Sequence, residues 1–197
     1  FSAGPCILPK QVLEKASQAL LNFNNLNLSL IEISHRSKDF IAVMDKAQAL
    51  VKDLLDVPEG YSVLFLQGGA STQFLMTAMN LLKTSGKADY INTGTWSKKA
   101  VKEAKKFGEI NIVASSEDKN FSYIPKKYSY LKEADYLHFT SNNTIFGTQF
   151  HEFPKVSKDT MLVCDMSSDI FSRKIDVSKF DLIYAGAQKN MGPAGTT

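Results

Sequence analysis

From Tyr61 onward, the sequence alternates short apolar runs with segments of helical periodicity. The apolar runs, which predict buried strands, lie at 62–66, 88–92, 111–114, 136–140, 161–165 and 182–185. Helical patterns follow the first two runs, at about 70–82 and 97–107, and two more precede Tyr61, at 9–23 and 40–57. Because such alternation is typical of a parallel sheet covered by helices on both faces, we predict an α/β fold of three layers (α/β/α) around a mainly parallel sheet.

Composition restricts the classes of partner. The chain has 197 residues, with 23 basic and 20 acidic side chains, and a net charge of +3 predicts neither a nucleic-acid nor a membrane surface. The cysteines, Cys6 and Cys164, and the three histidines show no metal-ligand spacing, so we predict no metal site. Cys164 lies in an apolar run and is expected to be a buried free thiol, which favours a cytoplasmic location.

In parallel α/β sheets, ligands bind beyond the carboxyl ends of the strands, which makes the residues there candidates for a site. One of them, the turn Gly68-Gly69-Ala70-Ser71-Thr72, leads from a strand into a helix. Glycines allow close backbone approach, and a helix start with hydroxyl groups can cradle a phosphate. Taken alone, the pattern is explained as well by an ordinary strand-to-helix turn.

Three other side chains stand at predicted strand ends. Lys189 follows small residues that could desolvate its amine and favour imine chemistry, although a surface lysine is the ordinary alternative. Asp165 ends a buried strand and needs a partner, either a protonated ring nitrogen or a local cap or salt bridge. Trp96 could stack on a flat ring or simply fill the core.

Before the second predicted helix stands the pair His35-Arg36. The arginine guanidinium matches the geometry of carboxylate and phosphate groups. A surface pair at a helix start is the alternative.

In their order and amino-acid sequence, these segments resemble those of the phosphoserine aminotransferases, enzymes of fold type I that depend on pyridoxal 5'-phosphate (PLP). The similarity runs from the first residue to the last. It is carried by FSAGP at 1–5, EISHRSKDF at 32–40, GGASTQF at 68–74, TGTWSKKA at 93–100, NTIFGTQF at 143–150 and AGAQKNMGPAG at 185–195.

The resemblance implies a role for each matching residue. Lys189 would bind PLP as a Schiff base and transfer the proton in catalysis, and Asp165 would pair with the pyridine nitrogen. The other cofactor contacts would be stacking by Trp96, phosphate binding by Ala70, Ser71 and Gln188, and a contact of Thr144 with the ring hydroxyl. Ala3, His35 and Arg36 would face the substrate.

The family pattern also implies an organisation and a reaction. Residues 1–15 would pack toward the substrate site, and 16–197 would form an incomplete PLP-binding large domain, whose mainly parallel sheet would have seven strands. A homodimer would transfer an amino group between L-glutamate and 3-phosphohydroxypyruvate, giving 2-oxoglutarate and O-phospho-L-serine for serine biosynthesis, with a possible second use in pyridoxine biosynthesis. A small C-terminal domain and a loop of the partner subunit would complete the active site, so this chain alone is expected to be inactive.

Two positions depart from the commonest family pattern: Ser71 replaces a frequent Arg, and Ala3 replaces Ser. Two alternatives remain open on the residues. One is another fold type I PLP enzyme, such as an alanine–glyoxylate or serine–pyruvate aminotransferase or a cysteine desulfurase. The other is a non-catalytic α/β module.

Overall fold

A computed structural model describes residues 4–82, 85–130 and 133–197 of the chain. The chain divides into two compact units: Cys6–Leu64, and Phe65–Thr197 together with the N-terminal segment Phe1–Pro5. The second unit contains the sheet and is called the sheet unit below.

The unit Cys6–Leu64 is helical. It contains α1 (Lys10–Leu21), the short 3-10 helix η1 (Phe23–Asn25) and α2 (Lys38–Leu54). Pro9 precedes α1, where a missing N–H costs nothing, and the Ser37 hydroxyl caps α2 by accepting a hydrogen bond from the Phe40 N–H at 3.3 Å. The two helices predicted from the apolar periodicity are therefore confirmed, to within a few residues at their ends.

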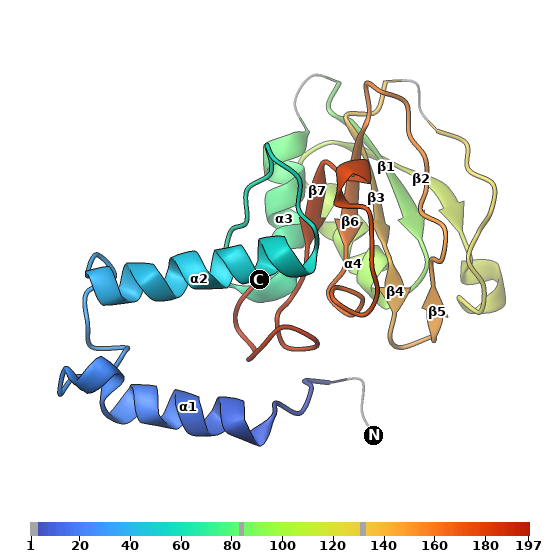
Figure 1. Ribbon diagram of the computed structural model, residues 1–197. Coiled ribbons are helices and arrows are strands. Elements are labelled where there is room, and N and C mark those ends of the chain that lie inside the picture. The colour runs from blue at the N-terminus through green and yellow to red at the C-terminus, as the bar shows by residue number, and fades with distance from the viewer. Residues whose placement is uncertain (1–3, 83–84, 131–132) are drawn as a thin grey trace. The chain divides into compact units, whose positions relative to one another are not determined.

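The sheet unit is built on five parallel strands in the order β2-β1-β3-β6-β7 (Figure 1). They are β1 (Lys87–Asn92), β2 (Glu109–Ser115), β3 (Tyr136–Thr140), β6 (Met161–Asp165) and β7 (Leu182–Tyr184). The apolar runs predict all five. For β3 and β6 the reason is burial on both faces, which favours continuous apolar residues. The predicted α/β class with a mainly parallel sheet is confirmed.

The predicted number of seven strands is wrong for the described residues. The run 62–66 forms no strand there, since it pairs only at its end, where Leu66 and Thr197 exchange two backbone hydrogen bonds of 2.7 and 2.9 Å. Conversely, a small antiparallel hairpin of β4 (Asn142–Asn143) and β5 (Thr148–Gln149) was not predicted. Two-residue strands are too short to show a sequence period.

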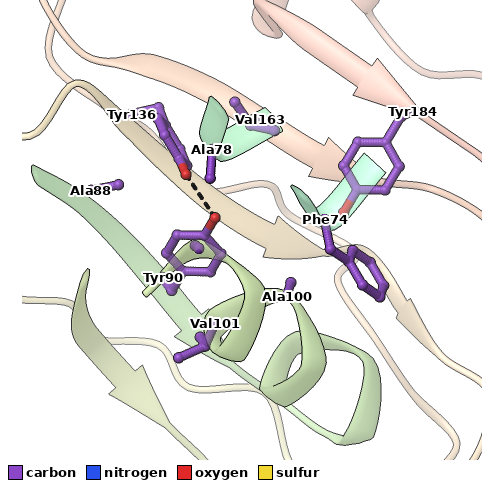
Figure 2. Close-up of a cluster of buried hydrophobic side chains, with 10 residues drawn as sticks. Phe74, Ala78, Ala88, Tyr90, Ala100, Val101, Tyr136, Val163 and Tyr184 are labelled. Atoms are coloured by element: carbon purple, nitrogen blue, oxygen red, sulfur yellow. Dashed lines mark hydrogen bonds between the residues drawn. The ribbon is translucent and has the colours of Figure 1, made fainter. Parts of the chain in front are cut away.

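Helices α3 (Gly69–Leu81) and α4 (Thr95–Ala104) pack on one face of the sheet. Their small residues Ala78 and Ala100 let the helices approach rings that project from the strands, among them Tyr90, Tyr136 and Tyr184 (Figure 2). The ring of Phe74 on α3 meets Tyr184 edge-on, with centroids 6.2 Å apart. This cluster fixes α3 and α4 against the strands that carry the site.

The opposite face is covered differently. Phe139 of β3 is fully buried and contacts the rings of Phe150, Phe153 and Phe180 at centroid distances of 5.1, 5.9 and 6.4 Å. Those rings come from irregular segments and from the end of the 3-10 helix η3 (Val177–Lys179). Among the residues described in the sheet unit, the predicted second helical layer is thus replaced by aromatic side chains from loops.

Two hydrogen-bonded pairs lie within the core. The Tyr90 and Tyr136 hydroxyls are 2.7 Å apart (Figure 2), and His138 Nε2 lies 2.8 Å from the Tyr184 hydroxyl. Burial lowers the pKa of His138 to about 3, so its ring, stacked on Tyr90, is neutral at physiological pH. Burial likewise raises the pKa of Tyr184. Each hydroxyl therefore keeps its proton and the pairs carry no charge.

Candidate active site

A pocket of about 450 Å³ opens at the carboxyl ends of the strands in the sheet unit. Thr140 and Asp165, the last residues of β3 and β6, lie in its wall, as do residues of the first turn of α3 and of the loop after β7. The volume is within the range of small-molecule sites. Its position is the one expected for a ligand of a parallel sheet. The lining residues are Gly4, Pro5, Gly69, Ala70, Ser71, Phe74, Trp96, Thr140, Asn142, Thr144, Asp165, Ser167, Ser168, Gln188, Lys189, Ala194 and Gly195.

The first turn of α3 forms one wall of the pocket through Gly69, Ala70 and Ser71. Gly68 stands at the helix cap with a φ of 95°, a conformation that favours glycine, and a Cβ there would overlap the side chain of Thr72. Thr72 instead donates its hydroxyl to the Gly68 carbonyl at 2.8 Å, which closes the turn. The positive end of the helix therefore faces the pocket, as an anion would require.

The carboxylate of Asp165 is the buried charge of the site, with 3% of the residue exposed. Burial raises its pKa, while hydrogen bonds from Ser167 and the charge of Lys189 act in the opposite direction. Ser167 donates its hydroxyl to Asp165 Oδ1 at 2.6 Å and its backbone N–H to the same oxygen at 2.9 Å. Both bonds reach one oxygen, so Ser167 does not engage the second.

Lys189 lies in the turn that follows β7, and this turn is tied down on both sides of the lysine. Before it, the Ala187 N–H donates to the Thr196 carbonyl at 2.8 Å. After it, the Asn190 side chain donates to the Ile170 carbonyl, also at 2.8 Å. The amine is thereby held in the same pocket as Asp165.

Trp96 reaches the pocket from the start of α4. The Ser97 hydroxyl caps this helix by accepting the Thr93 and Gly94 N–H groups, each at 2.9 Å. The amine of Lys99 lies 4.6 Å from the centroid of the Trp96 ring system, a cation–π contact. Thr144 reaches the pocket from the turn between β4 and β5.

The structure brings all the predicted cofactor-binding residues together in this one pocket: Ala70, Ser71, Trp96, Thr144, Asp165, Gln188 and Lys189. The predicted substrate residues are not among its lining. His35 and Arg36 are exposed in the turn before α2, in the other unit, and Ala3 lies outside the described residues. Their roles stay predictions.

The predicted cofactor-binding residues do not include several residues of the pocket, of which Ser167, Ser168 and Asn142 are the polar ones with side-chain hydrogen bonds. Asn142 and Ser168 form a pair in which the Asn142 amide donates to Ser168 Oγ at 2.9 Å. Ser167 shows one local signal, its spacing two residues after Asp165, which suits a turn in which a hydroxyl bonds a carboxylate. That spacing does not reveal that the turn lines a pocket.

The described residues offer neither a metal site nor a membrane-spanning helix. Within the described ranges, no group of three or more His, Cys, Asp or Glu side chains is placed to hold a metal ion. No helix in the described part of the chain combines the length and the apolar character needed to cross a membrane. Cys164 is a buried free thiol, as predicted, and Cys6 is exposed.

Comparison with known proteins shows which protein family the chain belongs to. Residues 1–197 match the family described as aminotransferase class-V, and the chain belongs to this family.

Within this family, the chain is similar to several phosphoserine aminotransferases. The chain is 65% identical over 198 residues to the phosphoserine aminotransferase of Flavobacterium johnsoniae. The aligned region covers 100% of this chain and 55% of that protein. The solved structure of phosphoserine aminotransferase from Bacillus circulans subsp. alkalophilus is similar with a TM-score of 0.95 at 48% identity, covering 100% of this chain and 55% of that one. PLP-bound phosphoserine aminotransferase from Trichomonas vaginalis gives a TM-score of 0.91 at 38% identity, with the same coverage. The chain thus spans about half the length of these relatives.

Proposed function

We propose that this chain is the cofactor-binding part of a PLP-dependent phosphoserine aminotransferase. The observation that carries the proposal is the pocket in which Lys189, Asp165 and Trp96 meet the start of α3. Family membership and the relatives at 59–65% identity support the same activity. The enzyme would move an amino group between L-glutamate and 3-phosphohydroxypyruvate and so produce O-phospho-L-serine in serine biosynthesis.

The residues of the pocket fit PLP. An amine, a buried carboxylate, a flat indole ring and a helix N-terminus are the groups that its aldehyde, pyridine nitrogen, ring and phosphate require. The carboxylate is the most specific of these, because a buried Asp needs a cationic or donor partner. When bound, PLP supplies an aldehyde that forms a covalent bond with an amine and a ring that withdraws electrons.

Each side chain then has a defined task. The Lys189 amine would hold the cofactor and carry the proton to and from the substrate Cα, acting as base and acid in turn. The Asp165 carboxylate would accept a hydrogen bond from the ring nitrogen and keep it protonated. Ala70, Ser71 and Gln188 would hold the phosphate, Trp96 would cover the ring, and Thr144 would contact its hydroxyl side.

The remaining predictions concern the substrate and the assembly. Ala3, His35 and Arg36 would face the phosphate or second carboxylate of the substrate, with residues 1–15 directed toward the site and 16–197 forming the PLP-binding large domain. Gly4 and Pro5 in the pocket lining support that direction for the N-terminal segment. We further propose a cytoplasmic homodimer whose active site needs groups beyond this chain.

Absorbance tests the cofactor assignment. The natural polypeptide that contains this sequence, mixed with PLP, should show the near-visible band of PLP bonded to a lysine. Lys189→Ala should abolish the band because no other described residue of the pocket lining carries an amine, whereas Lys155→Ala, at an exposed lysine outside the pocket, should leave it intact. Persistence of the band in Lys189→Ala would refute the assignment.

Kinetics test the substrate class. A phosphoserine aminotransferase should use 3-phosphohydroxypyruvate with a much higher kcat/KM than the unphosphorylated keto acids. Equal values for both would point instead to another aminotransferase of this fold.

A further inference from the structure

Ser167 connects the two groups that the proposed chemistry needs, and this inference rests on the proposed function. We infer that Ser167 is a positioning residue, which holds the Asp165 carboxylate in place relative to the Lys189 turn. It lies two residues after the end of β6 and in the wall of the pocket. It would act on the cofactor through Asp165.

The hydroxyl of Ser167 has a partner on each side. Its oxygen accepts a hydrogen bond from the Gly186 N–H at 3.1 Å, and its proton is donated to Asp165 Oδ1 at 2.6 Å. A serine hydroxyl has one proton to donate. Since the Gly186 N–H can only donate to the hydroxyl oxygen, that proton is directed to the carboxylate.

The same segment also supports the far side of the lysine. Ser167 binds Gly186, three residues before Lys189, and the Ile170 carbonyl accepts a hydrogen bond from Asn190, the next residue after it. The loop that follows β6 therefore fixes the Lys189 turn at both ends. The carboxylate and the amine are positioned by one short piece of chain.

The direction of the hydrogen bond has a chemical consequence. A donor to a carboxylate favours its ionised form, which is the form that can pair with a protonated ring nitrogen. Burial opposes ionisation of Asp165, and Ser167 offsets part of that cost. The other titratable groups beside Asp165 are Lys189, Tyr184 and Cys164, and a change at Ser167 alters none of their side chains.

The test is PLP affinity as a function of pH, measured by equilibrium dialysis with the natural polypeptide. Ser167→Ala should weaken PLP binding at pH 7 by roughly tenfold or more, the factor expected when a charged group loses a hydrogen bond. Its affinity should also begin to fall at a higher pH than in the unmodified protein, because Asp165 then takes up its proton more readily. Ser167→Thr keeps the hydroxyl and should restore both properties.

The chain offers a matched control. Ser178 donates its hydroxyl to Asp176 Oδ1 at 2.5 Å and its N–H to the same oxygen at 3.1 Å, which repeats the local geometry of Ser167 at an exposed site. Ser178→Ala should leave PLP affinity and its pH dependence unchanged. A loss there equal to that of Ser167→Ala would overturn the inference.

A double-mutant cycle separates positioning from a general structural effect. In an Asp165→Asn background, Ser167→Ala should weaken PLP binding less than it does in the unmodified protein, because the neutral amide has no charge for the hydroxyl to stabilise. An equal loss in both backgrounds would overturn the inference. If Ser167→Ala does not fold, Ser167→Cys replaces it, because a thiol is a weaker hydrogen-bond donor than a hydroxyl. A PLP affinity of Ser167→Cys equal to that of the unmodified protein would likewise refute the role. Failure of the unmodified protein to bind PLP would instead refute the proposed function itself.

Discussion

His138 should make the stability of this protein fall in acid, and substitution by a neutral side chain should remove that fall. The ring is 1% exposed, bonds the Tyr184 hydroxyl and has its pKa lowered from 6.5 to about 3 by burial. Between these pH values the unfolded chain binds a proton that the folded chain does not. Protonation of His138 in the unfolded chain therefore leaves the free energy of unfolding unchanged above pH 6.5 and lowers it progressively as the pH falls from 6.5 toward 3.

The magnitude follows from the two pKa values. The full difference corresponds to about 5 kcal/mol, of which about 2 kcal/mol should be lost between pH 7 and pH 5. His138→Gln can still hydrogen-bond Tyr184 but does not titrate, so its stability should fall by about 2 kcal/mol less over this interval than that of the unmodified protein.

Urea unfolding at pH 7, 6 and 5, at fixed protein concentration and without added PLP, measures the effect. His151 is exposed, and His151→Gln is the matched control, which should keep the acid dependence of the unmodified protein. The free energy of unfolding could instead fall equally with pH in the unmodified protein and in His138→Gln. That result would show that the buried ring is protonated or that this part of the core opens in mild acid, and would refute the reasoning.

Two further substitutions test the supports of the site. Gly94→Ala should destabilise the protein by about 2 kcal/mol more than Gly60→Ala in urea unfolding, because both glycines have positive φ but only at Gly94 would a Cβ overlap the Asn143 side chain. Equal losses would mean that Asn143 moves aside. Arg173→Met should cost about 3 kcal/mol, since it removes the 3.1 Å ion pair of the buried Asp169 and leaves that carboxylate without its cation. A loss in the free energy of unfolding below about 1 kcal/mol would mean that the Asp169–Arg173 ion pair contributes no more than an exposed surface pair.

For the described part of the chain, the sequence by itself determined the five strands of the parallel sheet, the four α-helices and the candidate cofactor-binding residues. Continuous apolar runs such as 136–140 and 161–165 indicate central strands, because they are too short for a buried helix, and a parallel sheet gathers the residues beyond their ends at one edge. That reasoning placed Asp165, Lys189 and the turn at Gly68 near one another, and the family resemblance gave Thr144 and Gln188 their expected roles. It could not count the strands, because strand formation at 62–66 depends on a neighbour that the local pattern does not specify.

Only the tertiary structure decided which local motifs belong to the site. Asp165-Met166-Ser167 and Asp176-Val177-Ser178 have the same spacing and the same pair of hydrogen bonds to a carboxylate. One is buried at the end of β6, where its hydroxyl also meets the Gly186 N–H, and the other is exposed at a 3-10 helix. The difference arises from burial and from a contact 19 residues away in sequence, which the local chain does not encode. The same reason explains why the neutral His138–Tyr184 pair could not be foreseen from an isolated histidine in an apolar run.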